Sequence, residues 1–479
     1  MIRILFCAFE ATPFIKTGGL GDVAGTLPGL IESEEYDIRV ILPKLSSIPY
    51  EYSEKMERID EFSVDLGWRK AYVGLEMLKY NGVTYYFIDN KQYFDRENVY
   101  GYYDDAERIV FFSKAIVAAL SKIPDFTVDI VHCNDWHTAL VPLLIKFQSN
   151  PGGDIKTVLT IHNNKFQGIF PGELLHDFIG VEENNDAVDA LIWKNDNINL
   201  LKGGIISSDK LTTVSPSYAK ELCTYEYGEG LDWLYRLEAH KMEGILNGIN
   251  LKEISPMKDK NIAKRYGIKT IEDKEICKKS LLAEMGFSEN IHRPVLGMVS
   301  RITDQKGFDI LIDIMDDLMK EDIVLIIVGV GEAYYERSFH IYSEAYGDRF
   351  AFRKEFNMAL SSRVYAGADI FLIPSKFEPC GLTQMMAMRY GAVPLVRETG
   401  GLIDSVNPYN EYTNEGNGFS FRNYESKELM NTVKYSLSVF SNKEEWRNLM
   451  IRCMKTNFSW NNSVKEYRRI YKELMNNGY

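Results

Sequence analysis

The sequence lacks several features that would place it in other classes of protein. Its six cysteines are widely scattered, with neither paired nor C-x-x-C spacing, so we expect reduced thiols and a cytoplasmic location rather than a disulfide framework. No apolar stretch approaches the ~20 residues of a membrane-spanning helix. No basic segment with a cleavage site precedes the first apolar run, so we also expect no signal peptide.

Positive charge is in short supply as well. Lys and Arg number 55 against 68 Asp and Glu, which gives a formal net charge of −13 and disfavours a nucleic-acid partner. A small phosphorylated ligand remains compatible with this charge, because it needs only a local basic pocket. The chain has 479 residues, 45% of them hydrophobic, which is enough for two or three domains with substantial cores.

The stretch over residues 370–396 gives the clearest indication of a ligand site. Two short apolar runs enclose a turn and a helix-compatible run, an order typical of strand, turn, helix and strand. Glu378 lies in the turn, and the backbone N–H groups of Gly381, Leu382 and Thr383 open the helix. Since ligands of open α/β sheets bind at the carboxyl ends of the strands, Glu378 is a candidate site residue.

A glycine-rich turn follows the strand expected at residues 2–6. Lys16 and three glycines precede a helix-like stretch that continues through residue 30. Glycines at such a turn allow backbone N–H groups to approach an anion closely. The pattern matches neither G-x-G-x-x-G nor a Walker loop, so phosphate binding and an ordinary tight turn both remain open.

Polar residues also follow the strands expected at 129–132 and 158–161. Asp135 and His137 come after the first of them, and His162 comes after the second. A metal site is conceivable here, but the sequence has no second ligand cluster with matching spacing, and we expect none. Contact with a polyhydroxy ligand is the better interpretation.

Two cations flank the turn after the strand expected at residues 295–299. Arg301 and Lys306 precede a helix expected at 308–320. Solvated surface cations are the ordinary alternative, but two cations ahead of a helix N-terminus suit a diphosphate.

An aromatic patch follows a hairpin that Asn81-Gly82 predicts between residues 72–80 and 83–88. The patch includes Tyr93, Tyr102 and Tyr103. These tyrosines belong either to a surface loop that packs on its own domain or to a stacking surface for the sugar rings of an acceptor.

The strands and helices form two arrays of similar size. Residues 251–293 are charged and weakly patterned and are the best candidate for a linker. Each array carries turns of ligand-binding type at its strand ends, so we expect two domains that face each other across a cleft. The pattern alone predicts a two-domain, nucleotide-type enzyme without naming its reaction.

Several motifs, taken in order, resemble those of bacterial glycogen synthases and plant starch synthases, the ADP-glucose-dependent enzymes of glycosyltransferase family five. The resemblance extends from about residue 2 to residue 471. The motifs at 16–22 and 377–384 are together highly specific, although each motif alone is weak. The motifs are Lys16-Thr17-Gly18-Gly19-Leu20-Gly21-Asp22, Asn134-Asp135-Trp136-His137, His162-Asn163 with Gln167-Gly168, Ile245-Leu246-Asn247-Gly248, Ser300-Arg301 with Gln305-Lys306-Gly307, Phe377-Glu378-Pro379-Cys380-Gly381-Leu382-Thr383-Gln384 and Arg397-Glu398-Thr399-Gly400-Gly401-Leu402.

The resemblance implies the GT-B fold, an α/β architecture of two Rossmann-like, doubly wound parallel-sheet domains facing across a cleft. The N-terminal domain would cover residues 1–248 on the acceptor side, and the C-terminal domain would cover 249–457 on the donor side. Residues 458–479 would form a helix that crosses back to the first domain. The implied reaction is retaining transfer of α-glucose from ADP-glucose to the non-reducing end of an α-1,4-glucan such as glycogen, with no metal or other cofactor.

The resemblance also implies how the donor is bound. Arg301 and Lys306 would bind the phosphates. Lys16 and the backbone of Gly18 and Gly19 would meet the diphosphate and the transferred glucose. A diphosphate whose charge is neutralised leaves without a strong general acid, so cations and correct placement are the main chemical requirements.

The remaining implied roles concern the glucose and the base. Glu378 and the backbone at Cys380 and Gly381 would hold the glucose hydroxyls, His162 would face the glucose, and Asp135 would lie near the reacting centre or the acceptor. Phe356 occupies the position where many relatives stack a tyrosine on adenine. The implied substrate-binding set also contains Asp22, Asn247, Leu382 and Thr383.

Some positions depart from the pattern of the family, and other functions stay open. Asn250 replaces a usual aspartate, Ile254-Ser255-Pro256 replaces a tryptophan motif, and Trp233 replaces a glycine. These changes concern domain closure and acceptor preference. The alternatives are a GT-B transferase that uses UDP-glucose or another acceptor, and a glucan-binding regulatory paralogue. Glycogen phosphorylase shares the broad fold, but it needs a lysine-bound pyridoxal phosphate and a longer chain, and the sequence has neither signature. The oligomeric state is left open.

Overall fold

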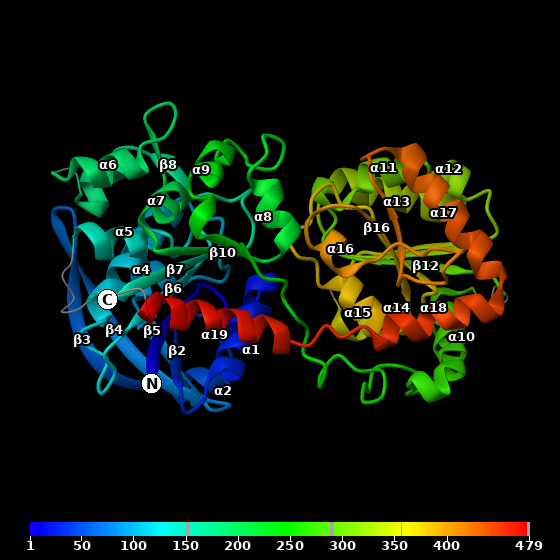
Figure 1. Ribbon diagram of the computed structural model, residues 1–479, viewed down its shortest axis with the longest axis horizontal. Coiled ribbons are helices and arrows are strands. Elements are labelled where there is room, and N and C mark those ends of the chain that lie inside the picture. Colours follow the sequence, from blue (N-terminus) through cyan, green and yellow to red (C-terminus); the bar gives the residue numbers. More distant parts are fainter. Residues whose placement is uncertain (149–153, 182, 288–291, 356, 477–479) are drawn as a thin grey trace. The chain divides into compact units, whose positions relative to one another are not determined.

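The computed structural model describes residues 1–148, 154–181, 183–287, 292–355 and 357–476. The chain divides into two compact α/β units (Figure 1). Unit 1 comprises Met1–Val214, Ala219–Ile245 and Trp460–Tyr479, and unit 2 comprises Ser215–Tyr218 and Leu246–Ser459. The sequence-based boundaries lie at 248 and 458, and the units divide after 245 and 459.

Unit 1 is built on one nine-stranded sheet in the order β11-β10-β7-β6-β1-β2-β5-β4-β3. The seven strands from β11 to β5 are parallel, whereas β4 pairs antiparallel with both β5 and β3. Asn81 and Gly82, both with positive φ, connect β4 to β5, which confirms the predicted hairpin. The strands are β1 (Ile2–Cys7), β2 (Tyr36–Pro43), β3 (Glu57–Leu66), β4 (Arg69–Tyr80), β5 (Val83–Asp89), β6 (Ile130–Asn134), β7 (Lys156–Ile161), β10 (Lys210–Thr213) and β11 (Met242–Gly244), with a separate pair β8 (Ile169–Pro171) and β9 (Asn197–Asn199).

Helices cover this sheet and are mostly short. They are α1 (Gly19–Ile31), α2 (Tyr50–Ser53), α3 (Lys91–Phe94), α4 (Asp105–Ala119), α5 (Leu140–Phe147), α6 (Asn185–Leu191), α7 (Leu200–Ser207), α8 (Pro216–Leu222), α9 (Asp232–Leu237) and α19 (Asn461–Asn476). A π-helical turn covers Leu175–Ile179, and a 3-10 turn covers Ala239–Lys241. The central strands are apolar on both faces because helices bury both sides of a parallel sheet.

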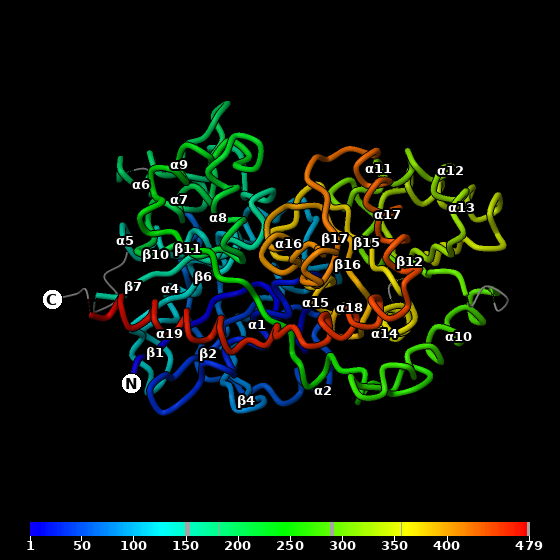
Figure 2. The backbone as a smooth tube through the Cα atoms, turned by 45° about the vertical axis from the view of Figure 1, so that its right-hand side comes forward, coloured from blue at the N-terminus to red at the C-terminus, as the bar shows by residue number. Residues whose placement is uncertain are grey.

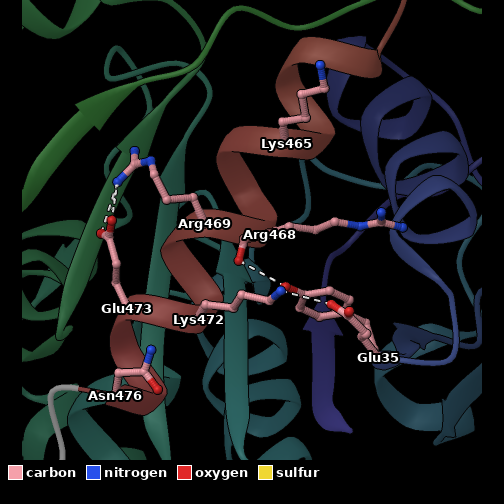
Figure 3. A pocket seen from close by; sticks show the side chains of 8 residues that line it. Glu35, Lys465, Arg468, Arg469, Lys472, Glu473 and Asn476 are labelled. Atoms are coloured by element: carbon pink, nitrogen blue, oxygen red, sulfur yellow. Dashed lines mark hydrogen bonds and ion pairs between the residues drawn. The ribbon is translucent and has the colours of Figure 1, made fainter.

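The last helix, α19, packs on unit 1 beside α1 (Figures 1 and 2). Its buried residues recur at helical spacing and form one apolar stripe; they are Ser463, Val464, Tyr467, Ile470 and Tyr471. Its polar face is held at the surface. Lys472 pairs with Glu35 at 2.9 Å, and the Tyr36 hydroxyl donates to the Arg468 carbonyl at 3.1 Å, in a pocket that Figure 3 shows.

Unit 2 contains a six-stranded, fully parallel sheet in the order β14-β13-β12-β15-β16-β17. Counting from β12 as the first strand, this is the order 3-2-1-4-5-6 of dinucleotide-binding folds, in which the strand order reverses between the first and fourth strands. The strands are β12 (Val295–Val299), β13 (Val324–Val328), β14 (Phe350–Arg353), β15 (Ile370–Ile373), β16 (Val393–Arg397) and β17 (Phe419–Phe421).

Helices lie on both faces of this second sheet (Figure 1). They are α10 (Lys274–Met285), α11 (Phe308–Asp313), α12 (Met315–Leu318), α13 (Ala333–Ala345), α14 (Met358–Gly367), α15 (Thr383–Arg389), α16 (Gly400–Ser405), α17 (Ser426–Ser441) and α18 (Lys443–Lys455), with 3-10 turns at Ile268–Asp273 and Asp304–Lys306. The helix expected at 308–320 is divided between α11 and α12, because Ile314 has the non-helical φ and ψ values of −104° and 1°.

The prediction that residues 251–293 form a linker is wrong. Its helical part, α10, packs against α14 and belongs to the body of unit 2. Lys278 forms an ion pair with Asp369 at 2.7 Å, and the buried Lys274 ammonium donates to the carbonyls of Tyr365 and Ala366 at the end of α14. Two of the charged residues that made this segment look solvated, Lys274 and Lys278, are therefore buried and paired. No helix among the described residues is long and apolar enough to span a membrane.

Candidate functional site

In unit 2, candidate residues gather where the strand order reverses. Lys306 follows β12, and Glu378 follows the adjacent strand β15. The Lys306 Nζ and Glu378 Oε2 atoms are 2.6 Å apart, and both side chains are largely buried. The two residues come from separate motifs of the sequence, and the ion pair joins the motifs at the edge where α/β sheets bind ligands.

Glu378 is fixed from several sides. It is 8% exposed, and the Ser375 hydroxyl donates to its Oε2 atom at 3.0 Å. The turn that carries it is held to the turn after β12, since the Lys376 N–H donates to the Gln305 carbonyl and the Gln305 amide donates to the Phe377 carbonyl. These bonds leave the carboxylate little freedom to move.

Two glycines explain how closely these turns approach one another. A Cβ atom on Gly307, which has a φ of +77°, would lie 2.0 Å from the Pro374 carbonyl oxygen. A Cβ atom on Gly400, which has a φ of +45°, would lie 2.1 Å from the Glu378 carbonyl oxygen. Only glycine combines these left-handed conformations with so close a backbone contact.

The other candidate phosphate-binding cation of unit 2, Arg301, is placed differently from Lys306. Arg301 is exposed, and its guanidinium has no ion pair or hydrogen bond among the described residues. Lys306 and Thr383 line one small pocket together with Ser300 and Ser375. The rest of its lining is apolar and comes from β12 and β15, and the space is too small for a phosphate group.

Asn247, near the start of the main segment of unit 2, contacts Cys380. The backbone N–H of Asn247 bonds to the Cys380 sulfur, and burial raises the pKa of that thiol to about 12. The Asn247 side-chain oxygen is buried and has no hydrogen-bond partner among the described residues. A buried acceptor of this kind is costly unless a ligand or water donates to it. Gly381 has a φ of +69°, and Leu382 leads into α15.

In unit 1, the strand order reverses between β1 and β6. Asp135 follows β6 with a φ of +58° and is 8% exposed. Its Oδ1 atom accepts the backbone N–H groups of His162 at 2.7 Å and Asn163 at 3.3 Å. Burial raises the pKa of Asp135 to about 7, although these two hydrogen bonds oppose the shift. Asp135 therefore carries an exchangeable proton near neutral pH.

Two histidines adjoin Asp135. The His162 Nε2 atom lies 3.0 Å from the Asn134 side-chain oxygen, and burial lowers the pKa of His162 to about 3. His137 is stacked against Phe9 and Tyr100, and burial likewise lowers its pKa to about 3. Its Nδ1 atom is buried without a hydrogen-bond partner in the described part of the chain. Both imidazoles are neutral at pH 7 and can exchange hydrogen bonds with hydroxyl groups.

The loop of residues 16–19 makes polar contacts within unit 1. Lys16 Nζ pairs with Asp22 at 2.6 Å, at the start of α1. The Gly18 N–H donates to the Glu10 carboxylate at 3.1 Å, and its expected contact with a diphosphate stays a prediction. Gly19 opens α1, whose N-terminus has no side-chain cap, and the first N–H groups of that helix are the ones suited to an anion.

Glu10 is the site residue that the sequence did not reveal. An isolated glutamate after an apolar strand gives no signal of its own, and its bonding partners are separated from it in sequence by 7, 8 and 90 positions.

The three acceptor tyrosines are not equivalent. Tyr93 is a correction: it is 2% exposed, packs on Phe111 and donates its hydroxyl to Glu107, so it has no ring face free for a sugar. Tyr102 is half-buried under the guanidinium groups of Arg96 and Arg108. Tyr103 is 99% exposed. Phe356, expected to stack on adenine, lies outside the described residues.

In the described part of the chain, no group of three or more His, Cys, Asp or Glu side chains is arranged to hold a metal ion. The clustered residues around Asp135 instead bond to one another and to the backbone.

Comparisons with known proteins cover nearly the whole chain. Residues 3–237 match the family model for the starch synthase catalytic domain, and residues 286–448 match that for glycosyl transferases group 1. A glycogen synthase of Clostridium beijerinckii is 45% identical, with 99% of both chains covered, and one of Desulforamulus reducens is 44% identical, with 100% of both covered.

A solved structure agrees with these relatives. The catalytic domain of starch synthase IV from Arabidopsis thaliana, bound to ADP and acarbose, superposes with a TM-score of 0.87 at 29% identity, with 99% of both chains covered. The strand orders of units 1 and 2 fit the two Rossmann-like domains of the GT-B fold. The chain belongs to the glycogen and starch synthase family of GT-B hexosyltransferases.

Proposed function

We propose that the protein transfers an α-glucosyl group from ADP-glucose to the non-reducing end of an α-1,4-glucan, with retention at the anomeric carbon and release of ADP. The full-length relatives named glycogen synthase support this proposal, as does the similar Arabidopsis structure that contains ADP and acarbose. The proposal involves no metal or other cofactor. It places the protein in the cytoplasm, which accords with its six free cysteines.

The observation that carries the proposal is the Lys306–Glu378 pair at the strand-order reversal of unit 2. In the proposed reaction, Lys306 and the exposed Arg301 neutralise the charge that develops on the leaving diphosphate. Glu378 accepts hydrogen bonds from the glucose hydroxyls and so fixes the anomeric carbon. Charges preorganised in a water-poor site stabilise a transition state more than mobile groups do.

Asp135 and His162 of unit 1 suit the sugar rather than the phosphate. Asp135 and His162 are held together through a backbone hydrogen bond, and both are buried. We assign them to hydroxyl groups near the reacting carbon, with neutral His162 as a hydrogen-bond partner and Asp135 as a group able to hold or release a proton.

Retention is attributed to a front-face route. Four carboxylates discussed above are each engaged: Glu378 with Lys306, Asp22 with Lys16, Glu10 with four donors, and Asp135 with two backbone N–H groups. A covalent glycosyl intermediate needs a free ionised carboxylate close to the anomeric carbon. The proposal therefore has the departing phosphate accept the proton of the acceptor hydroxyl on the same face.

One assay tests the proposal. Purified protein is incubated with ADP-glucose and glycogen, ADP release is measured, and each component is omitted in turn. We expect release only when protein, ADP-glucose and glycogen are all present, together with incorporation of glucose into the glucan. Faster turnover with UDP-glucose would assign a different donor. Glycogen binding without turnover of either donor would identify a regulatory paralogue.

A further inference from the structure

Glu10 is a buried carboxylate that the roles above leave unused. It is 4% exposed and follows β1, the strand that pairs with β6. Its Oε2 atom accepts the backbone N–H groups of Thr17 at 2.5 Å and Gly18 at 3.1 Å. Its Oε1 atom accepts the hydroxyls of Thr17 at 2.6 Å and Tyr100 at 2.7 Å. A carboxylate is stable at such a position only when donors occupy its lone pairs, and four donors do so here.

These donors connect two parts of unit 1. Three of them belong to the exposed 16–19 loop. The fourth, Tyr100, lies in an aromatic stack, with its ring centroid 4.7 Å from that of His137 and 5.7 Å from that of Phe9. Burial and the neighbouring Glu10 raise the pKa of Tyr100, so its hydroxyl keeps its proton and remains a donor. Glu10 thus connects the exposed 16–19 loop to the buried aromatic stack of Phe9, Tyr100 and His137.

The negative charge of Glu10 is unexpected beside a loop that would receive an anionic donor. A carboxylate repels a diphosphate, and this repulsion is stronger away from bulk water. Direct binding of the diphosphate is therefore excluded as the role of Glu10. Glu10 can instead act through the geometry that it imposes on the 16–19 loop.

We propose that Glu10 is a positioning residue for the sugar nucleotide: it holds the 16–19 loop so that Lys16 and the first N–H groups of α1 are directed at the donor. This inference rests on the proposed function. The Thr17 and Gly18 N–H groups are occupied by Glu10, and the uncapped N-terminus of α1 is left for the anion. Without Glu10 the loop would lose three hydrogen bonds at once and sample other conformations.

Two substitutions separate geometry from charge. Glu10→Gln removes the charge but keeps an oxygen for the two N–H groups, while its amide nitrogen faces the Thr17 and Tyr100 hydroxyls, which can accept as well as donate. Glu10→Ala removes every one of these bonds. Thr17→Val and Tyr100→Phe each remove a single hydroxyl. The matched control is Glu32→Ala, because Glu32 is a half-buried carboxylate at the other end of α1 that accepts the Ile38 N–H at 2.8 Å.

Steady-state kinetics give the first test. We expect Glu10→Ala to lower kcat/KM for ADP-glucose about 10²-fold, as displacement of a positioning group does, with the KM for glycogen unchanged. Glu10→Gln should remain near wild type, Thr17→Val and Tyr100→Phe should lie between the two, and Glu32→Ala should behave as wild type. The proposal is overturned if Glu10→Gln loses as much as Glu10→Ala, or if Glu10→Ala keeps its kcat/KM.

Amide hydrogen exchange gives a second test that needs no turnover. In wild type and in Glu10→Gln, the Thr17 and Gly18 amides should be protected, and in Glu10→Ala they should exchange fast while the strands of unit 1 stay protected. Equal protection in Glu10→Ala and wild type would refute the role of Glu10. If wild type releases no ADP, the proposed function fails, but this exchange result still decides whether Glu10 orders the loop.

Discussion

The ammonium of Lys306 lies 2.6 Å from the carboxylate of Glu378, across the point at which the strand order of unit 2 reverses. Lys306→Ala should lower kcat by about 10²–10³-fold, the loss seen when one preorganised donor to a developing anion is removed. The measurement is ADP release at saturating ADP-glucose and glycogen.

A surface ion pair of the same length provides the control. Lys320 and Asp317 are also 2.6 Å apart, but their side chains are 74% and 65% exposed. Exposed pairs contribute little to stability, and Lys320→Ala should leave turnover and unfolding unchanged. Normal turnover by Lys306→Ala would remove Lys306 from the site.

Gly400 permits the closest backbone contact behind Glu378. Gly400→Ala would place a Cβ atom 2.1 Å from the Glu378 carbonyl oxygen and force the turn to move. We expect kcat/KM to fall about 10²-fold, because small displacements of positioning groups have effects of this size.

The control separates backbone strain from the contact. Gly286 has a φ of +86°, and a Cβ atom there would meet nothing within 4 Å. Gly286→Ala should therefore cost only about 1–2 kcal/mol of left-handed strain and keep full activity. Equal activity losses in the two variants would show that the contact with Glu378 is unimportant.

Local patterns predicted much of this architecture, because they report on single elements. The apolar runs at 295–299 and 370–373 match β12 and β15, and Asn81-Gly82 marked the β4–β5 hairpin. The turns at strand ends were found because a parallel sheet places all such turns along one edge. Position along the chain was enough for these inferences.

Pairings between distant residues could not be found in this way. Lys306 and Glu378 are 72 positions apart, and Glu10 and Tyr100 are 90 apart, so nothing local in the sequence indicates either contact. Tyr93 seemed available to a sugar because aromatic residues clustered there, but its ring faces the core. The charged segment at 251–293 seemed to be a linker because buried lysines cannot be distinguished from solvated ones without their partners.

A buried polar chain anchors the last helix. The Tyr471 hydroxyl and the His132 Nδ1 atom are 2.7 Å apart, and the His132 Nε2 atom lies 2.7 Å from the Thr160 hydroxyl. Tyr471→Phe keeps the ring but leaves the His132 Nδ1 atom without that partner, so it should cost about 1–3 kcal/mol of unfolding free energy. Urea unfolding measures the loss.

Tyr346→Phe is the matched control for this change. The Tyr346 hydroxyl donates to Asp316 at 2.9 Å at the exposed surface. Removal of this hydroxyl should shift the unfolding free energy by no more than about 0.5 kcal/mol. If the two variants unfold alike, the hydrogen bond to His132 contributes nothing.

The buried carboxyl of Asp135 should make the unfolding free energy depend on pH. Burial raises its pKa from 3.8 to about 7 in the folded protein, so the folded state binds this proton more tightly than the unfolded chain does. The contribution of this Asp135 proton to the unfolding free energy is complete below about pH 4 and declines as the pH rises to about 7. It amounts to about 4 kcal/mol at most.

Asp135→Asn removes this titration and keeps an oxygen for the His162 and Asn163 N–H groups; asparagine also tolerates the positive φ of this position. The unfolding free energy of wild type minus that of Asp135→Asn should therefore fall between about pH 4 and 7 and be constant above it. Urea titrations across this range measure the difference. A constant difference throughout would mean that Asp135 has no raised pKa.

Turnover should not depend on metal ions. If Lys306 and Arg301 neutralise the leaving diphosphate, as proposed, a divalent cation is not needed for that purpose, and a chelator such as EDTA should leave ADP release unchanged. The Lys306→Ala variant sharpens the experiment, because added Mg²⁺ should not restore its rate when the missing charge must sit 2.6 Å from Glu378. Loss of wild-type activity in EDTA and its recovery with Mg²⁺ would show instead that a metal carries the charge of the leaving group, and the two cations would then need another role.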